Sequence, residues 1–241
     1  MKVLTLDIET SPHEGYAFQV WQANIAANQI ITPTCMLSFA AKWKGDAQSK
    51  TVYRTCFDSD MHETLHRLMN EADLIVTYNG DKFDLRHINR EFVERGFFPP
   101  KPVPSVDLLK VVKKNFAFPH NRLDYVCSRL LGETKLETGG FELWPAFMRQ
   151  EAAALRLMKR YNIKDTVLTE KLYVRLLPWI TNHPYVGGGG VVIDDADHVY
   201  TCPSCESTRN ERHQRRTRCF AIRTMHCQDC GTWFDGKRKK I

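Results

Sequence analysis

Two carboxylates near the N-terminus have the spacing of a metal site. Asp7 and Glu9 are two residues apart in a run of β-forming residues. On a strand, both side chains would project from the same face of the sheet, and Ile8 from the other. Two buried like charges are costly without protons or a cation, and carboxylate oxygens suit Mg²⁺ or Mn²⁺. The pair is compatible with a divalent metal site, but Asp-x-Glu is frequent in proteins, so the pair taken alone favours two solvated acids at an exposed strand end.

Further acids stand in contexts that allow a catalytic or a structural role. Asp84 follows an Asn-Gly turn at an expected strand-to-helix junction, where a carboxylate often caps the helix. Tyr161 and Asp165 are four residues apart in a helical stretch, so the phenol and the carboxylate would share one helix face. Asp107 lies on an expected strand, and we favour a structural role for it. Taken alone, Asp84 favours the capping role, and a Tyr and Asp pair on a helix indicates no particular chemistry.

Four cysteines near the C-terminus have the spacing of a zinc site. The pairs Cys202/Cys205 and Cys227/Cys230 each have two intervening residues, and 21 residues separate the pairs. This pattern fits one tetrahedral Zn²⁺ with four thiolates, and a redox CxxC is the weaker explanation. A fifth thiol, Cys219, is expected to be an interior residue of the module. The sequence therefore predicts one structural Zn²⁺.

The positive charge is confined to the C-terminal part. The chain has 34 Lys and Arg against 28 Asp and Glu, a formal net charge of +6. From residue 198 on there are ten basic and four acidic residues, so residues 1–197 carry equal numbers of each sign. A basic module indicates a polyanion partner, with Arg215 and Arg216 on phosphates and Trp233 stacking on bases. A solubilising surface, or a docking site for a replication or repair protein, is the alternative.

The elements that must position these residues alternate between strand and helix patterns. Strands are expected in an opening meander and at two later places, at 2–8, 35–43, 50–56, 74–78 and 106–112. Helical patterns cover 60–72, 83–95, 123–131 and most of 147–179. This order predicts a mixed α/β sheet flanked by helices.

The acidic motifs, taken in order, resemble those of a nuclease family. The segments Asp-Ile-Glu-Thr, Asn-Gly-x-x-Phe-Asp and Tyr-x-x-x-Asp resemble the DnaQ-like, DEDD superfamily of 3′→5′ exonucleases on the RNase H-like fold. The likeness is greatest to the proofreading domains of B-family DNA polymerases and their stand-alone relatives, and it covers about residues 1–180. It implies a five-stranded mixed sheet. Because Arg160 stands where a histidine-type enzyme would need histidine, the chain resembles the tyrosine type.

The resemblance also implies roles for individual residues around two Mg²⁺ or Mn²⁺ ions. Asp7 would bridge the ions, Glu9 and Asp165 would bind the ion on the nucleophile side, and Asp84 would bind the other. Tyr161 would orient the attacking water, since a phenol with a pKa near 10 stays protonated at neutral pH. The substrate contacts expected from the same motifs are Thr10, Asn79 and Phe83.

We therefore divide the chain into an RNase H-like exonuclease domain at 1–183, a Gly-rich and acidic linker at 184–198, and a basic zinc ribbon at 199–241. No apolar run approaches the roughly 18 residues of a membrane span, and acids occur too early for a signal peptide. We expect a soluble cytoplasmic protein. A polymerase domain does not fit, so proofreading would act in trans, and repair is an equal expectation.

The expected function is release of 5′-mononucleotides from a DNA 3′ end by two-metal-ion hydrolysis, with the ribbon helping to hold nucleic acid. An RNA 3′ exonuclease or a structure-specific nuclease would use the same acids. These residues do not indicate whether a 2′-hydroxyl is recognised, so both remain alternatives. A catalytically silent nucleic-acid-binding protein on the same scaffold is the third alternative.

Overall fold

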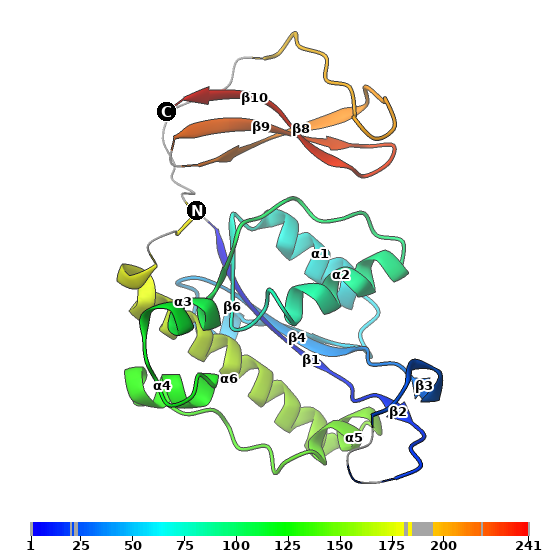
Figure 1. Ribbon diagram of the computed structural model, residues 1–241, viewed down its shortest axis with the longest axis vertical. Helices are drawn as coiled ribbons and strands as arrows, with labels where there is room; N and C mark the ends of the chain where they lie inside the picture. The colour runs from blue at the N-terminus through cyan, green and yellow to red at the C-terminus, as the bar shows by residue number, and fades with distance from the viewer. Residues whose placement is uncertain are drawn as a thin grey trace.

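A five-stranded mixed sheet forms the centre of the larger part of the protein (Figure 1). The computed structural model describes residues 2–19, 21, 24–180, 183–184, 195–217 and 219–240. In sheet order the strands are β5 (Val52–Thr55), β4 (Met36–Trp43), β1 (Val3–Thr10), β6 (Leu74–Thr77) and β7 (Ser105–Asp107). The central strand β1 pairs antiparallel with β4 and parallel with β6. The expected mixed five-stranded sheet is therefore confirmed.

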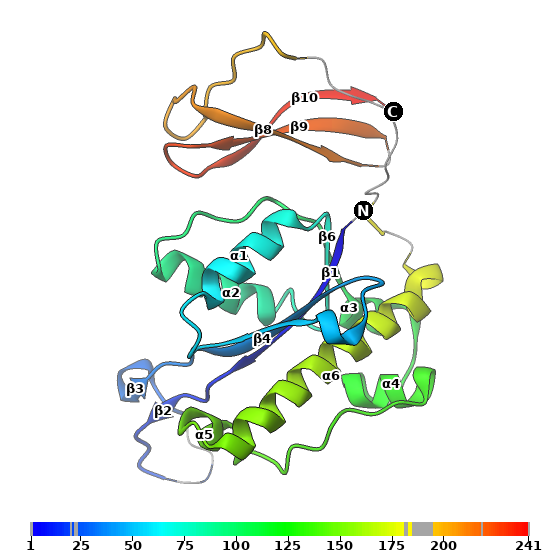
Figure 2. The ribbon, with the colours of Figure 1, turned by 180° about the vertical axis from the view of Figure 1, so that it is seen from behind.

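Helices cover both faces of this sheet (Figures 1 and 2). The helices are α1 (Met61–Glu71) and α2 (Asp84–Glu94) on one face, and α3 (Leu108–Asn115), α4 (Leu123–Leu131) and α6 (Ala152–Leu176) on the other. On β1, Leu4, Leu6 and Ile8 pack under α1 and α2. Val3 packs in the opposite core with residues of α6. Because side chains alternate along a strand, Asp7 and Glu9 face α6.

Two segments differ from the expected elements. The expected strand at 106–112 ends after three residues, and α3 begins at Leu108. The cause is Asp107, whose carboxylate accepts hydrogen bonds from the backbone N–H of Leu109 at 3.0 Å and of Asn79 at 2.8 Å. It thus caps α3, as the structural role expected for it required. The expected long helical stretch is divided between α5 (Leu143–Met148) and α6, with Gln150 at a positive φ of 60° between them.

Residues 12–34 form an excursion from the sheet that none of the expected elements covers. The excursion contains the short strands β2 (Glu14–Gly15) and β3 (Ile30–Thr32) and a 3-10 turn at Ala27–Gln29. It leaves the sheet at the end of β1 and returns at the start of β4, and it lies at the same end of the molecule as α5 (Figures 1 and 2).

The C-terminal module is a three-stranded antiparallel sheet. Its strands are β8 (Asn210–Arg216), β9 (Phe220–Cys227) and β10 (Trp233–Lys240), with β9 in the middle. Asp195 is buried in this module and pairs with Arg223 at 2.6 Å, although the expected boundary assigned it to the linker. The Gly-rich run of that linker lies outside the described residues. Cys219 is exposed next to the β8–β9 turn, so its expected interior position is wrong.

The module contacts the segment that follows α2. Trp233 donates a hydrogen bond from its indole nitrogen to the carbonyl of Pro99 at 3.1 Å, and the rings of Phe98 and His226 meet edge to face. Gly231 has a φ of +72°, and a Cβ atom there would lie 2.3 Å from the Phe98 ring. A side chain at this position would therefore be strained and would also push the module away. Figure 1 shows the module beyond the end of the sheet where β1 begins.

Candidate active site and zinc centre

Three carboxylates meet between the central strand and the longest helix. Asp7 and Glu9 on β1 and Asp165 on α6 each place an oxygen within 4.8 Å of the others. The two β1 acids share a face because they are two residues apart, and Asp165 faces them from the helix that covers that side. The structure thus brings together three of the four acids expected in the site.

Asp84, at the start of α2, approaches the same strand at the strand's backbone. It is the first residue of α2, is 4% exposed, and accepts a hydrogen bond from the backbone N–H of Ile8 at 3.1 Å. Ile8 lies between Asp7 and Glu9 in the chain, so Asp84 is held against the strand that carries both. The helix cap position is Phe83, which makes no capping hydrogen bond. Holding Asp84 beside β1, rather than capping α2, is what its carboxylate does here.

Two uncharged side chains that the sequence reasoning missed position the β1 acids. Asn162 is fully buried on α6, and its side-chain amide nitrogen donates to an Asp7 carboxylate oxygen at 2.6 Å. The Ser38 hydroxyl donates to the side-chain amide oxygen of Asn162 at 3.1 Å. Trp144 on α5 donates from its indole nitrogen to Glu9 at 3.2 Å. One signal was available for Asn162, since it stands three residues before Asp165 and so shares its helix face.

A lysine was also missed. Lys135 lies in the irregular segment between α4 and α5, with its ammonium 2.5 Å from Asp165 and 2.9 Å from the hydroxyl of Tyr161. Burial, together with the charge of Asp165, raises the pKa of Tyr161 above its usual value. Tyr161 therefore stays protonated at neutral pH and can donate a hydrogen bond, as its expected role requires. No periodic pattern marks Lys135 in the sequence.

The electrostatics of the acids are those of a cation site. Burial raises the pKa of Asp7 well above its usual range, and the charges of Asp165, Asp84 and Glu9 add to the effect. Burial likewise raises the pKa of Glu9 to about 8 and that of Asp84 to about 7. One oxygen of Asp165 is buried without a hydrogen-bond partner among the described residues. Converging carboxylates with a free oxygen fit a hard divalent cation such as Mg²⁺ or Mn²⁺.

The expected substrate contacts lie on the borders of this cluster. Thr10 follows Glu9 at an irregularity in the pairing of β1 with β4. Asn79 has a positive φ of 71° in the turn before α2, where its backbone N–H binds Asp107. Phe83 is 38% exposed and packs against His87. All three stand on the elements that carry the acids, and their contact with substrate stays a prediction.

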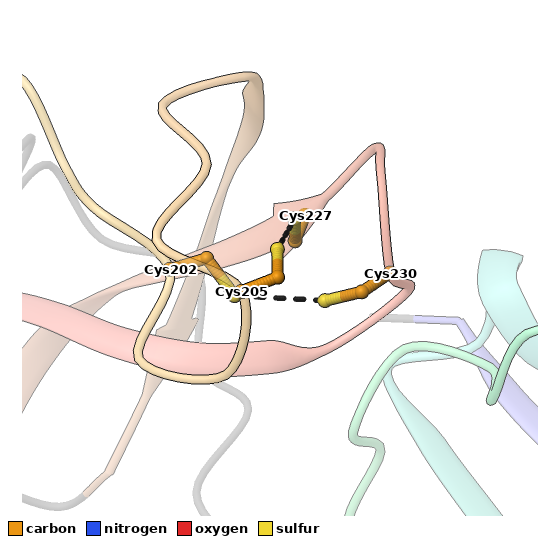
Figure 3. Close-up of side chains that lie close together, drawn as sticks. All are labelled: Cys202, Cys205, Cys227 and Cys230. Atoms are coloured by element: carbon orange, nitrogen blue, oxygen red, sulfur yellow. Dashed lines mark hydrogen bonds between the residues drawn. The ribbon is translucent and has the colours of Figure 1, made fainter.

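The four cysteines of the module form a second cluster (Figure 3). The sulfur atoms of Cys202 and Cys230 are 3.6 Å apart, as are those of Cys205 and Cys227, and all four fall within 4.8 Å. Four thiolates around Zn²⁺ at about 2.3 Å place neighbouring sulfurs about 3.8 Å apart. The backbone N–H of Gly231 binds the carbonyl of Cys227 at 3.0 Å, closing the tight turn after the second pair. The arrangement fits the expected structural zinc.

The residues expected to bind nucleic acid in the module have other contacts. Arg215 pairs with Asp235 at 2.5 Å across the surface of the sheet. The Trp233 ring is stacked on His226, with centroids 4.4 Å apart and planes 9° apart, and its nitrogen binds the segment after α2. Trp233 thus takes part in the junction between the module and the domain, and its stacking on bases stays a prediction. Arg216 lies on β8 beside Arg215, and its contact with phosphate stays a prediction.

A family model described as the RNase_H superfamily matches residues 4–177. The chain belongs to the RNase H superfamily. The matched residues contain every acid of the site and none of the module's cysteines. Membership therefore covers the acidic cluster, while the module with the four cysteines lies outside the matched region. Among the described residues, no helix is long and apolar enough to cross a membrane.

Archaeal DNA polymerases are among the relatives of this RNase H-like domain. It is 25% identical over 209 residues to a DNA polymerase of Thermococcus litoralis, covering 74% of this chain and 12% of that protein. A DNA polymerase of Thermococcus gorgonarius is 24% identical, covering 74% and 25%. The family B DNA polymerase of Pyrobaculum calidifontis shares the fold with a TM-score of 0.58 and 17% identity, covering 73% and 24%. The chain thus spans a quarter or less of these relatives, and the resemblance inferred from the motifs is confirmed.

Proposed function

We propose that this protein is a metal-dependent 3′→5′ exonuclease that releases 5′-mononucleotides from the 3′ end of DNA. The observation that carries the proposal is the convergence of Asp7, Glu9 and Asp165, with Asp84 held against the same strand. The pKa values raised by burial, and the unpartnered oxygen of Asp165, support a cation in this place. The relationship to DNA polymerases supports a nuclease domain that acts on DNA.

Each residue of the site has a task in phosphodiester hydrolysis. The four acids would hold two Mg²⁺ or Mn²⁺ ions, which lower the pKa of the attacking water and offset charge on the departing 3′ oxygen. Tyr161 stays protonated and orients a water through its hydroxyl. Asn162 and Trp144 fix the orientation of Asp7 and Glu9. These hydrogen bonds keep the Asp7 and Glu9 carboxylates directed toward Asp165.

The experiment uses 5′-labelled DNA and RNA oligonucleotides incubated with Mg²⁺ or Mn²⁺. We expect a ladder of products that shorten from the 3′ end of DNA, and no ladder with Asp7→Ala or Asp165→Ala. A ladder on RNA alone would overturn the DNA assignment. Unchanged activity in both purified variants would show that the site is elsewhere.

For the zinc module we propose a supporting role in holding nucleic acid. The last strand carries Lys237, Arg238, Lys239 and Lys240, and all four are exposed. Phosphate contacts by such residues give affinity without sequence preference. Docking of a replication or repair protein on the same surface is the competing role. Deletion of the module separates the two, because DNA binding weakens only if the module contacts nucleic acid.

A further inference from the structure

The excursion at residues 12–34 exposes a cluster of large apolar side chains. Within sixteen residues the exposed fractions are 75% for Tyr16, 101% for Phe18, 84% for Trp21, 44% for Ile25 and 58% for Ile31. Single exposed apolar residues are normal on protein surfaces, but a cluster of this density, with three aromatic rings, marks an interaction site. Its rings make no contribution to the core of the fold.

The base of the excursion is fixed beside the acids. Ser11, two residues after Glu9, is hydrogen-bonded to Cys35, the residue before β4. One bond joins backbone groups at 2.8 Å, one runs from the Cys35 N–H to the Ser11 hydroxyl at 2.9 Å, and the hydroxyl and the thiol also meet at 3.5 Å. Arg90 on α2 donates to the carbonyl of Thr34 at 2.7 Å. These bonds tie the excursion to the two strands and the helix that border the site, so the aromatic cluster continues the surface on which a substrate would lie.

The composition of the excursion indicates which part of a nucleic acid it would contact. Residues 12–34 contain no Lys or Arg, and the only acid, Glu14, accepts a hydrogen bond from Thr32. Phosphates therefore find no cation here. Bases have flat apolar faces that stack on Phe, Tyr and Trp whatever their sequence, and they are free to do so only where the strand is unpaired.

We propose that Tyr16, Phe18 and Trp21 form a stacking platform for unpaired bases near the 3′ end of the substrate strand. This inference rests on the proposed function, because it assigns the platform to that substrate. It divides recognition between two surfaces: the basic module contacts phosphates, and the excursion contacts bases. It also implies a preference for single-stranded or frayed ends over fully paired ones.

The two surfaces differ in how binding responds to salt, and this difference provides the test. Full-length Asp7→Ala protein, with its zinc retained, is titrated against a fluorescent single-stranded 12-mer at several NaCl concentrations. Replacing Phe18 or Trp21 by Ala should weaken binding about 5-fold or more, and leave the slope of log K against log salt unchanged. Replacing Lys239 and Lys240 by Ala should reduce that slope.

Two matched variants make the test specific. Trp179→Ala removes an exposed ring at the far end of α6, 51% exposed, and should leave the dissociation constant unchanged. Phe18→Leu keeps an apolar side chain but no flat ring, and should weaken binding as Phe18→Ala does. If Leu restores full affinity, the contact is not stacking and the proposal is overturned.

The remaining outcomes separate this proposal from the proposed function. Unchanged affinity in the Tyr16/Phe18/Trp21 triple alanine variant overturns the platform, whether or not the wild-type protein trims DNA. A wild-type dimer in sedimentation velocity that becomes monomeric in this variant, with unchanged DNA affinity, would assign the patch to a second copy of the chain. Absence of 3′ trimming by the wild-type protein overturns the proposed function instead.

Discussion

Each acid of the site is held by a different neighbour. Asn162 binds Asp7, the backbone N–H of Ile8 binds Asp84, and Lys135 binds Asp165. The motifs identified the acids because their types and spacing follow from the chemistry. Asn162 and Lys135 were not predicted, because an amide or an ammonium becomes informative only when the fold shows which carboxylate it contacts.

Asn162→Ala should reduce the exonuclease rate, because Asp7 would lose the hydrogen bond that fixes its orientation. Loss of such a partner to a metal ligand costs about 10- to 100-fold in metal affinity or activity. We expect a lower kcat and a higher Mg²⁺ concentration at half-maximal rate, measured in steady-state assays at several Mg²⁺ concentrations. Ser38→Ala serves as the milder control, because it removes the hydrogen bond that Asn162 accepts and leaves the one that Asn162 donates to Asp7. An equal loss of rate in the two variants would contradict the role given to Asn162.

Lys135→Ala should destabilise the protein when Mg²⁺ is absent. The Lys135 ammonium pairs with the buried Asp165 carboxylate at 2.5 Å, and a buried carboxylate left without its partner costs about 1–3 kcal/mol or more. Added Mg²⁺ should narrow the difference in Tm between variant and wild type, because a divalent cation replaces the lost charge. Scanning calorimetry with and without Mg²⁺ measures both effects. A difference in Tm that is the same in both conditions would contradict the idea.

At the scale of elements, a helix or strand was predicted correctly where its residues show a clear helical or strand periodicity. The helix expected at 123–131 is α4, and the strand expected at 74–78 is β6. The strand expected at 106–112 was wrong. The β-branched residues of this segment favoured a strand in the prediction, but in the structure the Asp107 carboxylate caps a helix that begins at Leu108. Residues 12–34 show neither helical nor strand periodicity. In the structure this segment is closed at its base by hydrogen bonds between Ser11 and Cys35, and contacts between residues so far apart in the chain cannot be predicted from a local pattern.

The junction of α1, α2 and β4 should give the protein an acid-sensitive contribution to stability. Burial alone would raise the pKa of Glu91, but hydrogen bonds from His62 and the Met36 N–H, with Arg90, outweigh it and lower the pKa to about 2. The folded pKa is below the unfolded one, so the stabilisation is complete above about pH 4.5 and disappears as the pH falls through about 2.

Denaturant unfolding of wild type and Glu91→Gln between pH 7 and pH 2 measures this contribution. The wild-type protein should lose about 1–3 kcal/mol more than the variant over that range. Parallel curves for the two proteins would show that Glu91 titrates in the folded state as it does in the unfolded chain. His62→Gln is a control that removes one of the side-chain partners of Glu91 and leaves Arg90 and Arg95, and it should give an intermediate result.

At the scale of the whole molecule, the acidic cluster and the cysteine cluster lie toward opposite ends of α2. Asp84 is the first residue of this helix, and the module contacts Phe98 and Pro99 just beyond its last turn. Eleven residues of helix span about 16 Å. The zinc module therefore stands well away from the acids, and its contribution to the substrate would fall on a more distant part of the strand.

Cys202→Ser and Cys230→Ser should release zinc and weaken DNA binding, while cleavage of very short oligonucleotides stays largely intact. A small module held by four thiolates depends on its metal for stability, and a short strand at the acids does not reach the module. A chromophoric chelator measures zinc release, and anisotropy titrations measure binding to DNA of increasing length. Equal DNA binding after deletion of the chain from residue 187 onward would indicate protein docking instead.

The close approach of Gly231 to Phe98 has a consequence for how digestion would end. The contact places the module against the segment after α2, at an offset from the acids. If the proposed function holds, a strand longer than this offset would be held at two points and degraded in one continuous encounter. A strand shorter than the offset would be held at one point and would dissociate after each cut. Digestion should therefore change from processive to distributive at one length, so that oligonucleotides of that size accumulate transiently.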